Sequence, residues 1–171
     1  KLQATKETFN KYFQKFRYPA FGYTYLGYNL LDPRFADKRV RQAITHAINK
    51  REIIAGVLLG YGTPCTGPFP PESWAFNPDV RDLSYDPELS KRLMKEAGWQ
   101  ASASGLLEKN GRPFEFTCIT NQDNEARLKT AQIIKESLRK VGIRMNIKVL
   151  EWQAMLHEFI DKKRFEAIIM G

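Results

Sequence analysis

The residue types that most often carry out chemistry in proteins are few in this sequence, and they are not spaced for it. His46 and His157 lie on different predicted helices, and neither has a second histidine three or four residues away. That spacing would place two imidazoles on one helix face as metal ligands, so both histidines are predicted to lie at the surface. Carboxylates such as Glu151 and Asp161 are scattered along the chain, and no general acid–base pair can be assigned.

Motifs for nucleophiles and phosphate-binding loops are also missing from the sequence. It contains no GxSxG elbow, no HExxH helix and no GxxxxGK[ST] loop. Cys65 lies in a Gly/Pro-rich stretch and Cys118 in a predicted strand, without a CxxC pair. We favour two free thiols, with a disulfide between them as the alternative. The sequence therefore predicts a protein that is not an enzyme and that needs no metal and no cofactor.

Residues suited to binding occur where the predicted strands end. In open α/β sheets, ligands bind outside the carboxyl ends of the strands. Aromatic side chains, amides and accessible backbone, without an evident arginine clamp, suit a peptide better than a sugar acid or a phosphate. The candidate ligand-binding residues are Tyr23, Tyr25, Gly27 and Asn29 from the first strand, Asn121 from the second, Trp152 after the third, and Gly171 after the last.

Each main candidate also has a purely structural interpretation. Trp152 opens a helix and can equally anchor that helix in the core. Tyr23 and Tyr25 share one side of a strand, as half-buried sheet residues do. Gly27 can mark close packing or a bulge, and Asn121 can be a turn residue before a helix.

The first two thirds of the chain alternate short helices, strands and an irregular stretch. The apolar residues at 40, 43, 44, 47 and 48 form one helical stripe, with His46 on the opposite side. Asp86, Pro87 and Gly98 supply start and stop signals for a helix. The predicted elements are a helix over 5–15 capped by Thr5, a strand over 23–30, helices over 37–48, 50–59 and 86–98, and a hairpin over 106–119 that turns at Asn110-Gly111.

The last third has the pattern of a βαβαβ series. A strand ending at residue 120 is followed by a helix over 123–140, a strand over 144–150, a helix over 152–160 and a strand over 165–170. Alternation of this kind predicts an α/β fold with a mixed, largely parallel sheet that is flanked by helices on both faces.

Composition supports one packed unit. The 171 residues are 43% hydrophobic, and no run approaches the roughly 20 apolar residues of a membrane-spanning helix. The net charge of +8 comes from basic residues interleaved with acidic ones, which favours solvated helix faces over a nucleic-acid surface. The chain begins at Lys1 without an initiator methionine, so we expect an excised piece of a longer protein.

An ordered series of motifs resembles the extracytoplasmic solute-binding proteins of family 5, the peptide-binding components of ABC importers. The resemblance covers nearly the whole chain and is nearest to members that bind longer peptides. The motifs are YLGYN at 25–29, FADKRVRQAI at 35–44, AINK at 47–50, GYGTP at 60–64 with GP at 67–68, YDP at 85–87, AGW at 97–99, VGI at 141–143 and FEA at 165–167.

The resemblance implies that residues 1–171 form most of the carboxy-terminal lobe of a two-lobed, type II-like periplasmic binding protein, with 1–22 as a hinge-proximal segment. It implies a peptide held between this lobe and a missing amino-terminal lobe, with Tyr25, Gly27 and Trp152 lining the cleft. The partners implied are ABC permease subunits, and the location is periplasmic or lipid-anchored outside the cell membrane. Relatives carry an acidic turn where this chain has ASASG at 101–105, so no calcium site is inferred.

Two alternatives to peptide binding follow. The first is a member of the same family that binds nickel complexes, haem or oligosaccharides. The second, of another class, is a small basic nucleic-acid-binding domain, which would bind DNA or RNA with a steep salt dependence.

Overall fold

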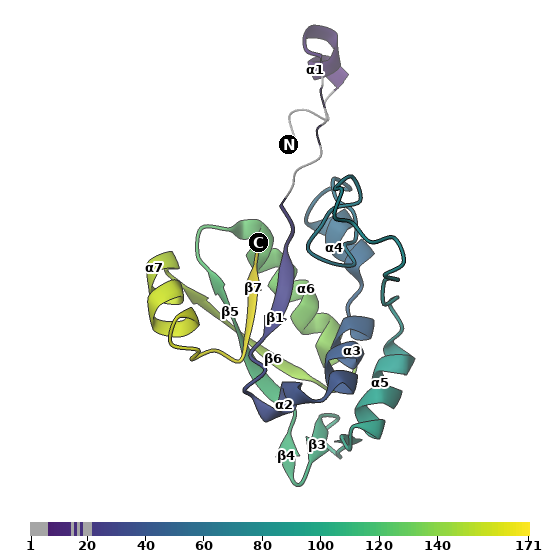
Figure 1. Cartoon of the computed structure of the whole chain (residues 1–171), viewed down its shortest axis with the longest axis vertical. Helices are drawn as coiled ribbons and strands as arrows, with labels where there is room; N and C mark the ends of the chain where they lie inside the picture. Colours follow the sequence, from purple (N-terminus) through teal and green to yellow (C-terminus); the bar gives the residue numbers. More distant parts are fainter. Residues whose placement is uncertain (1–6, 15, 17, 19–21) are drawn as a thin grey trace.

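The main β-sheet has four strands in the order β1-β7-β5-β6. The strands are β1 (Tyr25–Tyr28), β5 (Glu115–Asn121), β6 (Arg144–Leu150) and β7 (Ala167–Met170). β5 pairs in parallel with both β6 and β7, whereas β1 pairs antiparallel with β7. The computed structural model, which describes residues 7–14, 16, 18 and 22–171, thus confirms a mixed, largely parallel sheet (Figure 1).

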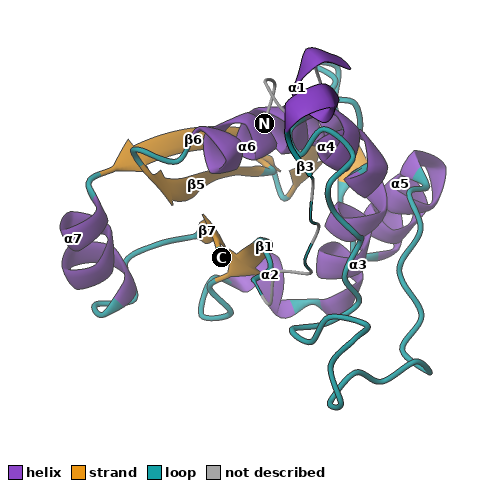
Figure 2. Ribbon diagram, turned by 90° about the horizontal axis from the view of Figure 1, so that it is seen from above, coloured by secondary structure: helices purple, strands orange, loops and turns teal. Residues whose placement is uncertain are grey.

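Helices cover both faces of the sheet because successive strand residues point to opposite sides. Phe116 and Cys118 of β5 belong to a large core with α3 (Lys38–Ala47), α5 (Pro87–Glu96) and α6 (Glu125–Arg139). Ile119 of the same strand belongs to a smaller core on the other side, where Met155 is fully buried. Figure 2 shows α3 and α5 together at one end of the molecule and α7 at the other.

Polar caps fix where several helices begin. The side chain of Asp86 accepts a hydrogen bond from the backbone N–H of Leu89 at 2.8 Å, which starts α5 as predicted. Asp37 caps α3 in the same manner. Asn124 accepts from the N–H of Arg127 at 2.9 Å and caps α6. Each cap satisfies an N–H group that has no partner inside the helix.

The segment between α4 (Lys50–Gly56) and α5 has no helix or strand, and its end is fastened to α3. Nδ1 of His46 lies 2.6 Å from the carbonyl oxygen of Ser84, and the N–H of Asp86 donates to the carbonyl of His46. His46 is only 7% exposed, so the prediction of a surface histidine is wrong there. Helical periodicity had set it opposite the apolar stripe, but the returning segment covers that side.

The predicted hairpin forms only in part. A small second sheet contains β2 (Gln100–Ala101), β3 (Leu107–Lys109) and β4 (Arg112–Pro113). Asn110 and Gly111 both have positive φ angles, of 52° and 71°, as a type I′ turn requires. The pairing stops at Pro113, and the chain then continues as β5 in the main sheet. A proline cannot donate to the ladder, which is consistent with this end of the hairpin.

The remaining helices are short. They are α1 (Glu7–Tyr12), α2 (Pro33–Ala36), α7 (Trp152–Ala154) and the π-helix η2 (Met155–Ile160), which continues α7. α1 stands apart from the other elements in Figure 1. The predicted cap Thr5 and the predicted helix end Lys15 lie outside the described residues, and the hinge-proximal role of 1–22 stays a prediction. Among the described residues, no helix combines the length and apolar character needed to cross a bilayer.

Candidate functional site

The carboxyl ends of the three parallel strands meet at one edge of the sheet, together with the start of β1. Asn121 at the end of β5 is paired with Leu150 at the end of β6. Met170 near the end of β7 is paired with Tyr25, because β1 runs antiparallel to β7. This carboxyl edge therefore spans four strands, or about 14 Å at roughly 4.8 Å per strand spacing. Binding sites of open α/β sheets lie at such an edge.

Two exposed tyrosines begin the row at the β1 side. The ring centroids of Tyr23 and Tyr25 are 5.6 Å apart, and the side chains are 38% and 41% exposed. Gly27 provides room for this arrangement: a Cβ there would lie 3.2 Å from both the Tyr25 ring and the side chain of Ile168. Gly27 itself lies inside β1 opposite Ile168, so its contribution is close packing.

Asn121 lies in the middle of the row and is held on both sides of its amide. Nδ2 donates to the carbonyl of Gln122 at 2.6 Å, and Oδ1 accepts from Nη1 of Arg127 at 2.7 Å. The N–H of Gln122 donates in turn to the carbonyl of Leu150, which ties the loop after β5 to β6. The structure thus brings the guanidinium of Arg127 to the carboxyl edge.

Sequence reasoning missed Arg127 and found no arginine clamp. The signal was present, because Arg127 lies in the first turn of α6, where a cation opposes the helix dipole. An arginine in that position gains nothing from the dipole, and a reason for it lies outside the helix.

Trp152 ends the row at the β6 side and lies at the surface. It is the first residue of α7 and is 37% exposed, whereas Met155 takes the buried position beneath this helix. Glu151 caps α7, and its Oε2 accepts from the N–H of Ala154 at 2.9 Å. Hydrogen bonds from the backbone N–H groups of Gln153 and Ala154 lower the pKa of Glu151. Of the two interpretations of Trp152, the structure favours the edge over the core.

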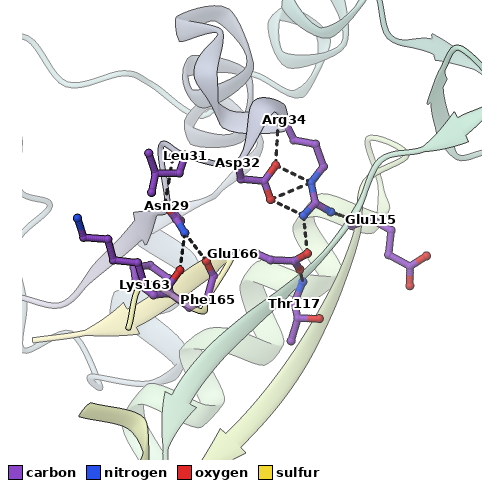
Figure 3. Close-up of polar contacts among 9 residues, drawn as sticks. All are labelled: Asn29, Leu31, Asp32, Arg34, Glu115, Thr117, Lys163, Phe165 and Glu166. Atoms are coloured by element: carbon purple, nitrogen blue, oxygen red, sulfur yellow. Dashed lines mark hydrogen bonds and ion pairs between the residues drawn. The ribbon is translucent and has the colours of Figure 1, made fainter. Parts of the chain in front are cut away.

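Asn29 does not belong to this row, and its predicted place at the carboxyl edge is wrong. It follows the other end of β1, beside the start of β7, because the two strands are antiparallel. Its Nδ2 donates to the carbonyls of Lys163 and Phe165 at 3.1 and 2.8 Å, and its Oδ1 accepts from the N–H of Leu31. Figure 3 shows these contacts fastening the turn after β1 to the segment before β7.

An arginine-centred cluster, the Arg34 clamp, occupies the same opposite edge (Figure 3). Arg34 forms ion pairs with Asp32 and Glu166 and donates to the carbonyl of Glu115. Glu166 Oε2 also accepts from the N–H of Thr117 at 2.5 Å. The clamp therefore joins the segment before α2, the start of β5 and the segment before β7, and it holds β1 and β7 in register from the end remote from the tyrosines.

The clamp shifts the protonation of its members. Burial by itself raises the pKa of Asp32, but hydrogen bonds from Arg34 and its positive charge outweigh burial, and the net pKa is lowered. The hydrogen bond to Asp32, followed by the contact with Glu166, raises the pKa of Arg34. Both groups are therefore charged at neutral pH.

The part of the chain that the structure describes contains no group of three or more His, Cys, Asp or Glu residues that could hold a metal ion. His157 is exposed and lies 3.0 Å from Asp161, on the same helix. Cys65 and Cys118 are both free, and burial raises the pKa of the Cys118 thiol to about 12. The carboxyl edge instead offers aromatic faces, an oriented amide and a guanidinium, which are groups that bind.

Two hollows of about 340 and 350 Å³ lie between α4 and α6 and beside the small sheet. Neither lining contains any of the predicted ligand-binding residues. The carboxyl edge is therefore considered as one wall of a site and not as one of these hollows.

Known proteins that resemble this chain come from one family. The oligopeptide-binding protein AppA of Bacillus subtilis is 36% identical over 156 residues, which are 89% of this chain and 29% of AppA. The dipeptide-binding protein of Escherichia coli is 35% identical over 155 residues, which are 90% of this chain and 27% of that protein. The chain thus spans less than a third of the length of these relatives.

Comparison with solved structures agrees. The structure of Bacillus subtilis AppA in complex with a nonapeptide superposes with a TM-score of 0.82 over 86% of this chain and 30% of AppA, at 36% identity. The sequence profile of the bacterial extracellular solute-binding proteins, family 5, matches residues 2–171. The chain therefore belongs to the bacterial extracellular solute-binding proteins of family 5.

Proposed function

We propose that this chain forms one wall of the ligand site of a solute-binding protein that captures peptides and delivers them to the permease of an ABC importer. One observation carries the proposal. The carboxyl edge presents Tyr23, Tyr25, Asn121 and Trp152 in one row of about 14 Å, about the length of four extended residues. The AppA structure was solved with a nonapeptide, which supports an extended peptide as the ligand.

The mechanism follows from one wall being insufficient. A peptide bound at this edge is covered on one side only, so a second body must close on it, and we assign that role to an amino-terminal lobe. Ligand that contacts both bodies stabilises the closed arrangement by the free energy of the contacts that exist only there. The permease then distinguishes loaded from empty protein by that closed arrangement. These steps require a location outside the cytoplasm, periplasmic or lipid-anchored.

The chemistry of the row suits ligands of varied sequence. Aromatic faces contribute apolar contact area with little conformational entropy to lose. The backbone at Gly171 is free of a side chain, and extended peptides are bound largely through main-chain hydrogen bonds. Affinity would then depend weakly on the side chains of the peptide.

The test uses the complete protein that contains this chain. After purification without added ligand and mild denaturation, mass spectrometry is expected to identify released peptides. Trp152→Ala and Tyr25→Ala should each weaken peptide binding by about tenfold, because a buried aromatic contact contributes more than 1 kcal/mol. Trp74→Ala is the matched control, because Trp74 is 98% exposed in the segment between α4 and α5. Unchanged affinity of the Trp152 and Tyr25 variants would refute this site.

A further inference from the structure

The guanidinium of Arg127 is the one cationic group that the structure ties directly to a member of the predicted row, through the 2.7 Å hydrogen bond from Nη1 to Oδ1 of Asn121. We propose that Arg127 recognises a carboxylate group of the bound peptide. This inference rests on the proposed function and adds the ligand class that this wall of the site selects.

The charge balance of the half-buried arginines supports this role. Arg34, which is also half-buried, forms ion pairs with two carboxylates. Arg127 forms none within the described residues, and its side chain makes a single hydrogen bond, to Asn121. A partly desolvated cation without a counter-ion is costly. A carboxylate that arrives with the ligand would supply the missing charge at this position.

The contacts of Asn121 orient the guanidinium. Because Nδ2 donates to the carbonyl of Gln122 at 2.6 Å, the amide of Asn121 must present Oδ1 toward Arg127. One N–H of the guanidinium is thereby fixed, and four N–H groups of the planar fork remain to donate. A carboxylate matches two parallel N–H donors of such a fork. Asn121 is a positioning residue in this scheme, and Arg127 makes the contact.

The experiment compares peptide pools on the complete protein. Three pools of random pentapeptides are offered: one with free carboxyl termini, one with carboxy-terminal amides, and one with free termini in which Asn and Gln replace Asp and Glu. Retained peptide is quantified by mass spectrometry after gel filtration. We expect wild-type protein to lose about tenfold in retention when the recognised carboxylate is removed. A loss with the amide pool assigns the carboxy terminus, and a loss with the third pool assigns an acidic side chain.

Variants separate contact from structure. Arg127→Met should abolish the difference between the pools. Arg139→Met, at the other end of α6 about 18 Å away, removes the same charge and should preserve it. Asn121→Asp should also abolish the difference, because an internal carboxylate then occupies the fork while both residues keep their size. Arg127→Lys keeps the charge without the fork and should reduce the difference, which covers the case in which the Met variant fails to fold.

The outcomes are distinguishable from failure of the proposed function. If wild-type protein retains no pool, peptide binding itself is refuted, and the inference falls with it. If wild-type protein retains all three pools equally, or if Arg127→Met keeps the full difference between pools, peptide binding stands and the role of Arg127 is refuted.

Discussion

The carbonyl oxygen of Tyr23 lies where the Cβ of any residue other than glycine at position 171 would be. The two segments run side by side because β1 is antiparallel to β7, with Tyr25 paired to Met170. The start of one strand and the end of another thus meet at the carboxyl edge with no side chain between them. Glycine at 171 is what allows the exposed tyrosines and the end of β7 to share this edge.

Gly171→Ala in the complete protein should therefore destabilise this edge. The added methyl group overlaps the carbonyl of Tyr23 and lies close to Thr24, and overpacking of this kind costs about 1–3 kcal/mol. Urea denaturation measures the change in the free energy of unfolding. Gly67→Ala is the control, because nothing lies within 4 Å of a Cβ at 67. Equal effects of the two substitutions would show that the close approach at 171 is unimportant.

Arg34→Met should lower the free energy of unfolding by about 2 kcal/mol, because it leaves the carboxylates of Asp32 and Glu166 without their charged donor. The control is Arg144→Met, whose pair with Glu115 is largely exposed and should cost less than about 1 kcal/mol. Chemical denaturation of both variants provides the comparison. A loss for Arg34→Met no greater than that for the control would mean that the clamp does not stabilise the fold.

The clamp also predicts a dependence of stability on acid. The pKa of Asp32 is lower in the folded protein than in the unfolded chain, where an aspartate titrates near about 3.9. Its stabilising contribution is therefore complete above about pH 4 and is lost as the pH falls through the lower folded value. Asp32→Asn retains the size of the capping side chain and removes the charge.

We thus expect the stability difference between wild type and Asp32→Asn to be largest at neutral pH and to shrink below about pH 4. Denaturation curves from pH 7 to pH 2 measure it. Asp79→Asn, at an exposed carboxylate, should differ little from wild type throughout. A difference for Asp32→Asn that stays constant down to pH 2 would contradict the assignment.

The two cysteines should differ sharply in reactivity. Cys118 is 1% exposed, and burial raises its pKa to about 12, whereas Cys65 is partly accessible. Because the thiolate is the reactive form, iodoacetamide at pH 8 should alkylate Cys65 in the folded protein and Cys118 only after unfolding. Peptide mapping by mass spectrometry identifies the modified residue. Modification of Cys118 at the rate of Cys65 would mean that this part of the core opens readily.

Local patterns in the sequence determined the helices and strands of the last third. The bounds of β6 agree with the predicted strand over 144–150, and α6 and β7 fall inside their predicted ranges. The turn at Asn110-Gly111 also formed as predicted. These features depend on hydrophobic period, caps and turn residues, which act over a few neighbouring positions.

Two errors show what local patterns leave out. His46 was assigned to the surface from its side of α3, but the segment ending at Ser84 covers it. Asn29 was grouped with Tyr25 because both belong to one strand. The antiparallel pairing of β1 with β7 sends them to opposite edges of the sheet.

The row at the carboxyl edge combines both levels. The sequence by itself determined which residues end the strands, because a strand end is marked by the turn or helix signals that follow it. Only the tertiary structure decided the direction of β1, the position of Arg127 beside Asn121, and the closeness of Tyr23 to Gly171. Those relationships join residues that are far apart along the chain, and they are set by strand order and packing, to which no local period or cap responds.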